Sequence, residues 1–164
     1  MGIFKLIKNI FKRSKSGSNP QIVIGIPGID AQHHEFFQKC DAILDYLRKD
    51  SASANVVSKF FNEVIELLKN HFFTEENLFE IIGFPRAEEH KAEHANFMDQ
   101  ILRQEAILNN SENAETVYFI NTFREAFLSH IVVFDKPYTN HIEKLVALGK
   151  KFKITTLKAQ TLTK

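Results

Sequence analysis

The residues that could carry chemistry are five histidines and two acids spread along most of the chain. They are His33, His71, Glu75, His90, His94, His130 and Asp135. Two pairs in this set have a spacing of four residues, which places both side chains of each pair on one face of a helix. Five imidazoles and two carboxylates could hold two six-coordinate metal ions if both carboxylates bridge, and this mixture of nitrogen and hard oxygen donors suits iron.

Apolar neighbours indicate that these histidines lie on or near the core face of their helices. Phe72 and Phe73 follow His71, and a run of four apolar residues follows His130. An unpaired polar group in such surroundings costs a few kcal/mol, and a shared metal site would remove that cost. Taken singly, each histidine is more simply interpreted as a core or surface residue that binds no metal. The ordered set of seven donors favours a metal site instead.

The balance of histidine and carboxylate bears on the chemistry of the metals. The chain lacks the two Glu-x-x-His pairs that are typical of carboxylate-bridged di-iron bundles of the ferritin type. A site rich in histidine gives the metals less negative charge. We therefore expect it to bind O2 rather than to activate O2 as a strong oxidant.

Other polar residues near this set are expected to lie outside it. His34 would point about 100° away from the preceding histidine on a helix, toward the surface, and Glu76 should likewise face a different side from the preceding glutamate. His141 is expected to be exposed. Cys40 is expected to be a small residue of the core.

Apolar residues recur at three- and four-residue steps in four segments, which predicts four helices. The expected ranges are 30–49, 56–82, 85–108 and 117–134, and the last should end or kink near Pro137. Asp30 is predicted to be the N-cap of the first helix, and Gly83 the C-cap of the second. Because the connections are short, we predict an all-α, up-down-up-down antiparallel four-helix bundle.

The composition fits one domain with basic ends. The chain has 164 residues, 44% of them apolar, and its single cysteine excludes an internal disulfide. Residues 1–19 and 150–164 each carry five basic side chains and no acid, whereas residues 20–149 have a net charge of −9. We therefore divide the chain into a basic amino-terminal segment 1–19, a bundle 20–149 and a basic tail 150–164. The acidic bundle makes nucleic acid an unexpected partner.

Segment 1–19 has the pattern of an amphipathic helix. Its apolar residues fall on one side of a helical wheel and its lysines on the other. Such a helix lies on an anionic membrane surface, where each basic residue contributes about 1 kcal/mol. Charges interrupt the run too early for a signal peptide, so we expect a cytoplasmic protein at the inner face of the membrane. The alternative is an extra helix that packs on the bundle or on a partner protein.

Between Gly25 and His141 the sequence resembles the hemerythrins, specifically the single-domain bacteriohemerythrins. Four motifs carry the resemblance: GIPGIDAQHHEFF around His33, HFFTEE from His71, GFPRAEEHKAEH through His94, and HIVVFDK from His130. Two features depart from the family pattern. The chain has no tryptophan, so the packing of the pocket must differ, and Pro137 follows closely on Asp135.

The resemblance implies a non-haem di-iron centre and assigns its ligands. One iron would take His90, His94 and His130, and the other would take His33 and His71 and keep one open position. Glu75 and Asp135 would bridge the irons together with an oxo or hydroxo group. In the family, O2 binds end-on at the open iron, receives two electrons and the bridging proton, and is held as hydroperoxide. The apolar residues that we expect around O2 are Phe37, Phe72, Ile131 and Phe134.

The function that the resemblance implies first is reversible O2 binding. The protein would then be a carrier, a store or a local supplier of oxygen rather than an enzyme. An oxygen-consuming enzyme at the membrane would be its partner if segment 1–19 binds there. One alternative is a sensor or interaction module that responds to O2 or to redox state. The others are peroxidase or oxidase chemistry and iron storage at the same site.

Overall fold

The computed structural model describes residues 20–49, 54–108 and 113–148. In chain order its elements are η1 (Pro20–Ile22), α2 (Pro27–Lys49), α3 (Ala54–Ile82), α4 (Ala87–Leu108), α5 (Asn113–His130), η2 (Ile131–Asp135) and α6 (Lys136–Ala147). The basic segments 1–19 and 150–164, and with them the expected amphipathic helix, lie outside the described residues. None of the described helices is both long enough and apolar enough to cross a membrane.

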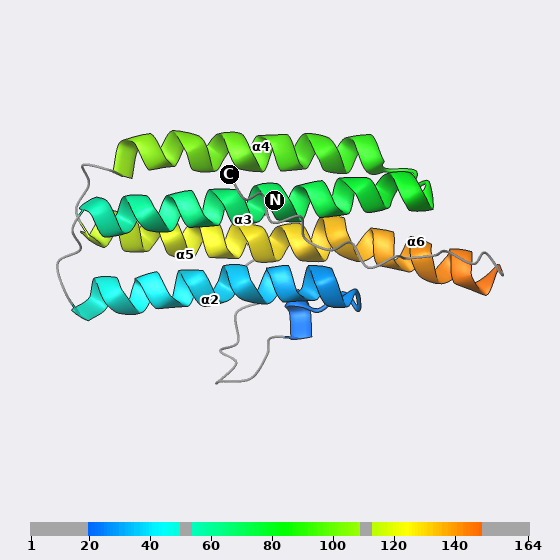
Figure 1. Ribbon diagram of the computed structural model, residues 1–164, viewed down its shortest axis with the longest axis horizontal. Helices are drawn as coiled ribbons and strands as arrows, with labels where there is room; N and C mark the ends of the chain where they lie inside the picture. Colours follow the sequence, from blue (N-terminus) through cyan, green and yellow to red (C-terminus); the bar gives the residue numbers. More distant parts are fainter. Residues whose placement is uncertain (1–19, 50–53, 109–112, 149–164) are drawn as a thin grey trace, which may run out of the picture.

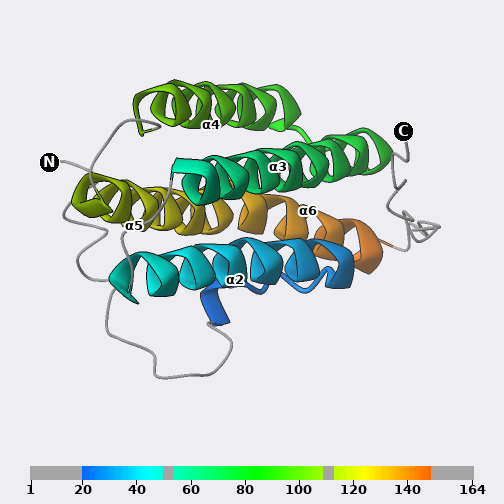
Figure 2. The same cartoon turned by 60° about the vertical axis from the view of Figure 1, so that its left-hand side comes forward.

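The four long helices form an antiparallel bundle. Helices α2, α3, α4 and α5 lie side by side, and each runs opposite to the one before it (Figure 1). Helix α2 packs against α3 and α5, and α3 packs against α4. Helix α6 extends from the end of α5 (Figure 2). Every regular element in the described ranges is helical, which confirms the predicted all-α, up-down-up-down bundle.

Helix α2 begins earlier than expected, at Pro27. Proline suits a first helical position because the N–H that it lacks would have no partner within the helix. The N–H of Asp30 donates to the carbonyl of Ile26 over 2.8 Å, so Asp30 lies in the first turn and the prediction that it is the N-cap is wrong. Its carboxylate instead accepts hydrogen bonds from the N–H groups of Ile24, at 2.7 Å, and Gly25, at 3.1 Å. Asp30 therefore fixes the entry into the helix.

Helix α3 ends as predicted at a glycine. Gly83 has a φ of +59°, a left-handed conformation that costs glycine little. Its N–H donates to the carbonyl of Glu80, and the N–H of Phe84 donates to the carbonyl of Phe79. The rings of Phe79 and Phe84 also pack together, with centroids 5.4 Å apart. These bonds and this contact are the features of a Schellman cap, which turns the chain directly into α4.

The fourth long helix differs from its predicted form. It ends at His130, and residues Ile131–Asp135 form a π turn, in which the N–H of Lys136 donates to the carbonyl of Ile131. Pro137 then falls in the first turn of α6, where a missing N–H is tolerated. The break thus begins before the proline, and the chain continues as a helix beyond it.

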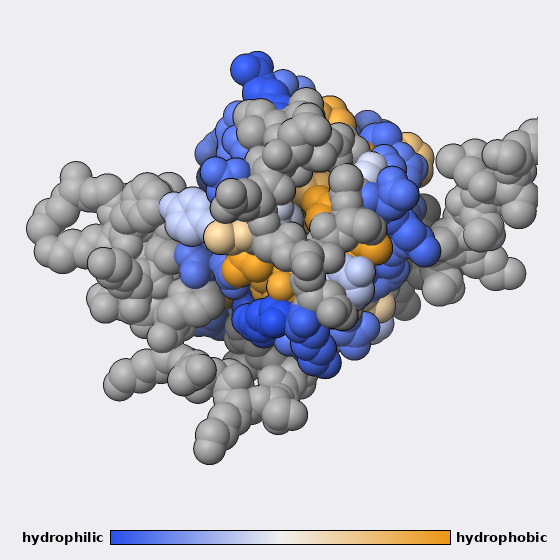
Figure 3. Space-filling model, turned by 90° about the vertical axis from the view of Figure 1, so that its left-hand side faces the viewer, coloured by the Kyte–Doolittle hydropathy of each residue, from blue (hydrophilic) through white to orange (hydrophobic). Residues whose placement is uncertain are grey.

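The core consists of two clusters of buried apolar side chains. The larger fills the bundle on the side where α2 ends and α3 begins, and the smaller contains Ile29, Phe79 and Tyr138. Seen from the end of the bundle at which α2 ends, hydrophobic side chains gather near the middle of the described surface, with hydrophilic ones around them (Figure 3). On α2, His33 lies between Ile29 of the smaller cluster and Phe36 of the larger. The predicted donors therefore occupy a layer between the two clusters.

Candidate metal centre

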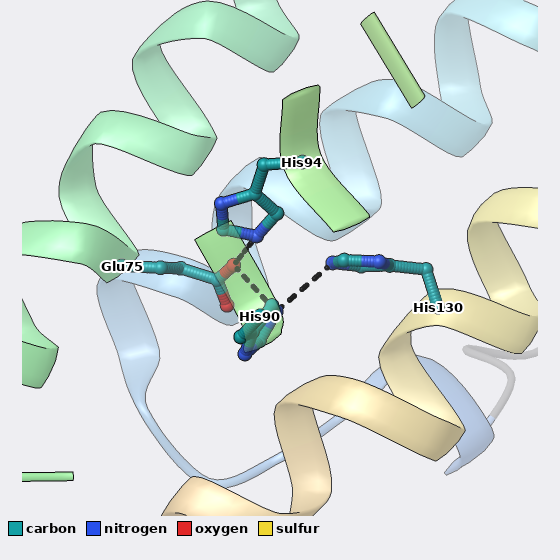
Figure 4. Close-up of side chains that lie close together, drawn as sticks. All are labelled: Glu75, His90, His94 and His130. Carbon is teal, nitrogen blue, oxygen red and sulfur yellow. Dashed lines mark hydrogen bonds and ion pairs between the residues drawn. The ribbon is translucent and has the colours of Figure 1, made fainter. Parts of the chain in front are cut away.

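The structure brings all seven predicted donors together inside the bundle, and none of them is more than 2% exposed. Their side-chain nitrogen and oxygen atoms form two groups, in each of which the donor atoms lie within 4.8 Å of one another. The first group contains Glu75, His90, His94 and His130, and Figure 4 shows these side chains converging from α3, α4 and α5. The second group contains His33, His71, Glu75 and Asp135. Glu75 belongs to both groups.

Helical spacing places two of the donor pairs. His71 and Glu75 are one turn apart on α3, and Nε2 of His71 lies 3.5 Å from Oε2 of Glu75. His90 and His94 are one turn apart on α4, and their ring centroids are 4.4 Å apart. In both pairs the four-residue spacing alone directs the two side chains to the same place.

The π turn places the last pair. His130 and Asp135 are five residues apart, which would put them about 140° apart around an α-helix with 100° per residue. In the π turn each backbone hydrogen bond spans five residues instead of four, and Nε2 of His130 lies 3.2 Å from Oδ1 of Asp135. The local widening of the helix therefore brings Asp135 to the centre despite the spacing.

The carboxylate of Asp135 lies between the two groups of histidines. Its Oδ1 is 3.1 Å from Nε2 of His90 and 3.2 Å from Nε2 of His130. Its Oδ2 is 3.3 Å from Nε2 of His33. The two oxygens thus face different sets of rings, which is the placement that a bridging carboxylate needs.

Glu75 also faces both sets of rings. Its Oε2 is 3.2 Å from Nε2 of His94 and 3.5 Å from Nε2 of His71. Its Oε1 accepts a hydrogen bond of 2.6 Å from the hydroxyl of Tyr138, which is fully buried. Sequence reasoning missed Tyr138, although its position three residues after Asp135 on a helix was a usable signal.

Three of the rings form a hydrogen bond through Nδ1, the ring nitrogen that faces away from the centre. His33 donates to the carbonyl of Ile22 over 2.7 Å, and the Nδ1 atoms of His71 and His94 lie 3.2 Å from Oε1 of Gln32 and 2.9 Å from Oε1 of Glu76. Because these acceptors require a proton on Nδ1, they leave Nε2 as the lone-pair atom that faces the centre. Glu76 faces a different side from Glu75, as expected, but it contacts the site through the ring of His94. Sequence reasoning also missed Gln32.

Several of the atoms that face the centre lack hydrogen bonds. Within the described part of the chain, Nε2 of His33, His71 and His94 has no hydrogen-bond partner, and neither has Oε2 of Glu75 or either oxygen of Asp135. Each buried polar group left in this state costs about 1–3 kcal/mol. Lone pairs of nitrogen and oxygen point at one another here, so cations placed between them would remove the cost. The donor set therefore fits metal ions.

The electrostatics of the site favour the neutral, metal-binding form of His71 and His94. Burial lowers the pKa of His71 well below its usual range, and burial together with the neighbouring His130 lowers the pKa of His94 to about 4. Burial and the charge of Asp135 raise the pKa of Glu75 to about 8. Burial opposes the charged form of Asp135 too, but His130 and the surrounding rings hold its pKa well below the usual range. Asp135 thus keeps its negative charge although it is buried.

Aromatic side chains surround the donors. Phe72 stacks on His94 at a centroid distance of 4.0 Å and contacts His71 at 5.4 Å. Phe127, which sequence reasoning missed, lies 5.8 Å from His33 and 5.4 Å from His71. Its seven-residue spacing from Phe134 on the expected helix was too weak a signal to separate it from other core residues.

The other three residues predicted to line an O2 pocket lie at different places. Phe37 contacts Phe127 at 6.0 Å and so lies behind it. Ile131 is fully buried in the larger cluster. Phe134 is half-buried against the rings of His90 and His130, at 5.5 Å and 5.4 Å, and so belongs with the first group of donors.

The remaining candidates lie outside the two groups. His34 is half-buried, and its Nδ1 donates to the carbonyl of Asp30 over 2.7 Å. His141 is half-buried rather than exposed as predicted, because its Nε2 donates to the carbonyl of Ile82 over 3.1 Å. Cys40 is buried in the core as expected, and burial raises the pKa of its thiol to about 12.

Comparison with known proteins identifies one family. The model of the hemerythrin HHE cation binding domain matches residues 25–138, a range that includes all seven predicted donors. Neither a curated protein nor a solved structure matches the chain.

Proposed function

The chain belongs to the family of hemerythrin HHE cation-binding domains, and on this basis we propose that it binds two iron ions and uses them to bind O2 reversibly. The observation that carries this proposal is the sharing of carboxylates. Glu75 belongs to both groups of donors, and the two oxygens of Asp135 face different sets of rings. Two ions held in this way would be neighbours with common ligands.

The donors divide unequally between the two irons. We assign His90, His94 and His130 to one iron and His33 and His71 to the other. Glu75 and Asp135 would be the ligands that the two irons share. The second iron then has one protein ligand fewer than the first. The bound pair would supply an open coordination position and the two electrons that reversible O2 binding needs.

The residues of the chain supply the positions and the surroundings for this chemistry. Tyr138 holds one oxygen of Glu75 through its hydroxyl, and that oxygen keeps a second lone pair for a metal. Phe72 and Phe127 cover His71 from the apolar core. A neutral diatomic molecule enters such surroundings more easily than water or an ion does, which favours binding over turnover.

We propose further that the protein works in the cytoplasm at an anionic membrane surface, to which segment 1–19 would attach it. This rests on the sequence alone, through the separation of apolar and basic residues on a helical wheel. The recipient of the oxygen would then be a membrane-associated enzyme that consumes it. Co-sedimentation with vesicles that contain anionic lipid tests this: the full chain should pellet and a chain that starts at Pro20 should not. Equal pelleting of the two would contradict it.

The experiment that tests O2 binding is an optical cycle. The protein is reduced without air, exposed to O2 and then deoxygenated. We expect iron-dependent bands in the near ultraviolet and the visible to appear with O2 and to fade when it is removed. A single irreversible conversion to an oxidised form would contradict reversible binding and point to peroxide chemistry, sensing or storage.

A further inference from the structure

The three outer hydrogen bonds of the histidine rings differ in the charge of their acceptor. His33 is held by a backbone carbonyl and His71 by the neutral amide of Gln32, whereas His94 is held by the carboxylate of Glu76. In the described part of the chain, Nδ1 of His90 and Nδ1 of His130 have no hydrogen-bond partner. Among the described residues, His94 is therefore the one predicted ligand whose outer nitrogen is hydrogen-bonded to a carboxylate.

Glu76 is well placed to act through His94. Its Oε1 is 2.9 Å from Nδ1, while Nε2 on the other side of the ring is 3.2 Å from Oε2 of Glu75. Phe72 is stacked on the ring with an interplanar angle of 13°, which fixes the plane of the imidazole. The carboxylate, the ring and the centre thus form a continuous line of contacts.

The carboxylate of Glu76 lies at the edge of the site, partly in contact with solvent. Its side chain is 35% exposed, so water still solvates it. Among the described residues, no lysine or arginine lies within ion-pair distance of it, and His94 is its one such partner. The charge is therefore not neutralised by a neighbouring cation and can act on the ring.

We infer that Glu76 is a positioning residue that strengthens His94 as a donor and thereby lowers the reduction potential of the iron centre. This inference rests on the proposed binding of two irons. A carboxylate that accepts the Nδ1 proton of a ligating imidazole fixes the orientation of the ring and raises the basicity of its other nitrogen. A more basic Nε2, with a negative charge behind it, stabilises ferric iron more than ferrous iron. Gln32 holds His71 in the same way but adds no charge.

This asymmetry favours the iron that has all three of His90, His94 and His130. That iron would be the easier of the two to oxidise. At the iron with the open position, the ligand rings would have only uncharged hydrogen-bond partners at Nδ1, the carbonyl of Ile22 and the amide of Gln32. Because O2 binding takes electrons from the pair, a lower potential also favours the oxygenated form. Glu76 therefore acts on oxygen affinity from outside the layer of ligands.

The test compares variants that remove or add one charge behind a ring. Glu76→Gln keeps an oxygen that can accept from His94 but removes the charge. Gln32→Glu adds a charge behind His71. Glu80→Gln is the control, because Glu80 is one turn further along α3, is 73% exposed and pairs with Lys91 rather than with a ring. The measurement is the reduction potential of the iron-loaded protein by spectroelectrochemistry, together with its iron content.

We expect Glu76→Gln to raise the potential, Gln32→Glu to lower it and Glu80→Gln to leave it unchanged. If Glu76 only held the ring in place, Glu76→Gln would behave like the control, and that result would overturn the inference. If Glu76→Gln loses its iron, Gln32→Glu provides the test instead. An unchanged reduction potential in Gln32→Glu would also contradict the inference, because it would show that a charge behind a ligand ring does not act on the irons. A parent protein that binds no iron at all would instead overturn the proposed function, which the iron content shows separately.

Discussion

The hydroxyl of Tyr138 donates a hydrogen bond of 2.6 Å to Oε1 of Glu75, inside a layer of the bundle that is closed to solvent. The two residues are far apart in sequence, on α6 and α3, and the π turn before α6 is what brings the phenol to this position. The bond satisfies one oxygen of the carboxylate that both groups of donors share. Tyr138 is thus part of the structure that holds the centre.

We therefore predict that Tyr138→Phe weakens the centre without changing the fold. The ring keeps its shape, but Oε1 of Glu75 loses its partner in a buried site, at a cost of about 1–3 kcal/mol in the free energy of unfolding. Urea unfolding of the metal-free protein measures this cost. Tyr118→Phe is the control because Tyr118 is 73% exposed. Equal stability of both variants would show that the bond to Glu75 contributes nothing.

A second prediction concerns metal content. His71→Ala should reduce the iron bound per chain, because the donor group to which His71 belongs has only one other histidine, His33. His34→Ala is the matched control: His34 is half-buried on the same bundle but bonds to a carbonyl of its own helix. Iron analysis of the purified variants gives the answer. Full iron content in His71→Ala would contradict the assignment of this ligand.

A third prediction concerns the dependence of stability on pH in the metal-free protein. The folded chain keeps the proton of Glu75 up to about pH 8, whereas the unfolded chain loses it near 4.5. Above pH 6.5 the folded state therefore binds more protons than the unfolded state, and stability falls as the pH rises toward 8. The pKa of His130 is raised as well, with burial opposed by the charge of Asp135, and it acts in the same direction.

The opposite slope is expected at lower pH. The lowered pKa values of His71, His90 and His94 mean that the unfolded chain takes up protons near pH 6.5 while these folded rings do not. Stability attributable to them falls as the pH drops below 6.5. Unfolding by urea at a series of pH values should therefore show a maximum near pH 6.5. Glu75→Gln should reduce the fall between pH 6.5 and 8, and an identical fall in that variant would contradict the role given to Glu75.

A fourth prediction concerns the aromatic cover of the centre. Phe127→Leu leaves space beside His33 and His71, and we expect water to reach the irons and the oxygenated form to decay several-fold faster. Stability should fall by roughly 1–2 kcal/mol. Phe119→Leu is the control, since Phe119 contacts Phe61 and Phe123 but no ring of a predicted ligand. Equal decay rates in the two variants would show that Phe127 does not shield the centre.

Sequence periodicity was sufficient to predict the helices and the two pairs of donors that are one turn apart. It also predicted the end of α3, because a glycine followed closely by proline is a local signal of a helix end. The sequence did not allow the start of α2 or the form of the fourth helix to be predicted correctly. A proline at a first helical position and a π turn both depend on hydrogen bonds that residue spacing does not specify.

The outer partners of the ligands could not be predicted from one helix at a time. Glu76 points away from Glu75 on its own helix, and it reaches the centre only because His94 on the neighbouring helix presents Nδ1 to it. Gln32 and Tyr138 likewise act on residues of α3 from other helices. Such contacts follow from the way the helices pack, which a helical wheel does not contain.

The shared carboxylates Glu75 and Asp135 are expected to join two irons in one centre. Mössbauer and electron paramagnetic resonance spectra of the oxidised, iron-loaded protein test it most directly, because shared ligands couple the spins of neighbouring ferric ions. We predict two irons per chain in a coupled pair with no paramagnetic resonance signal. A signal from isolated high-spin ferric iron, at one iron per chain, would contradict it.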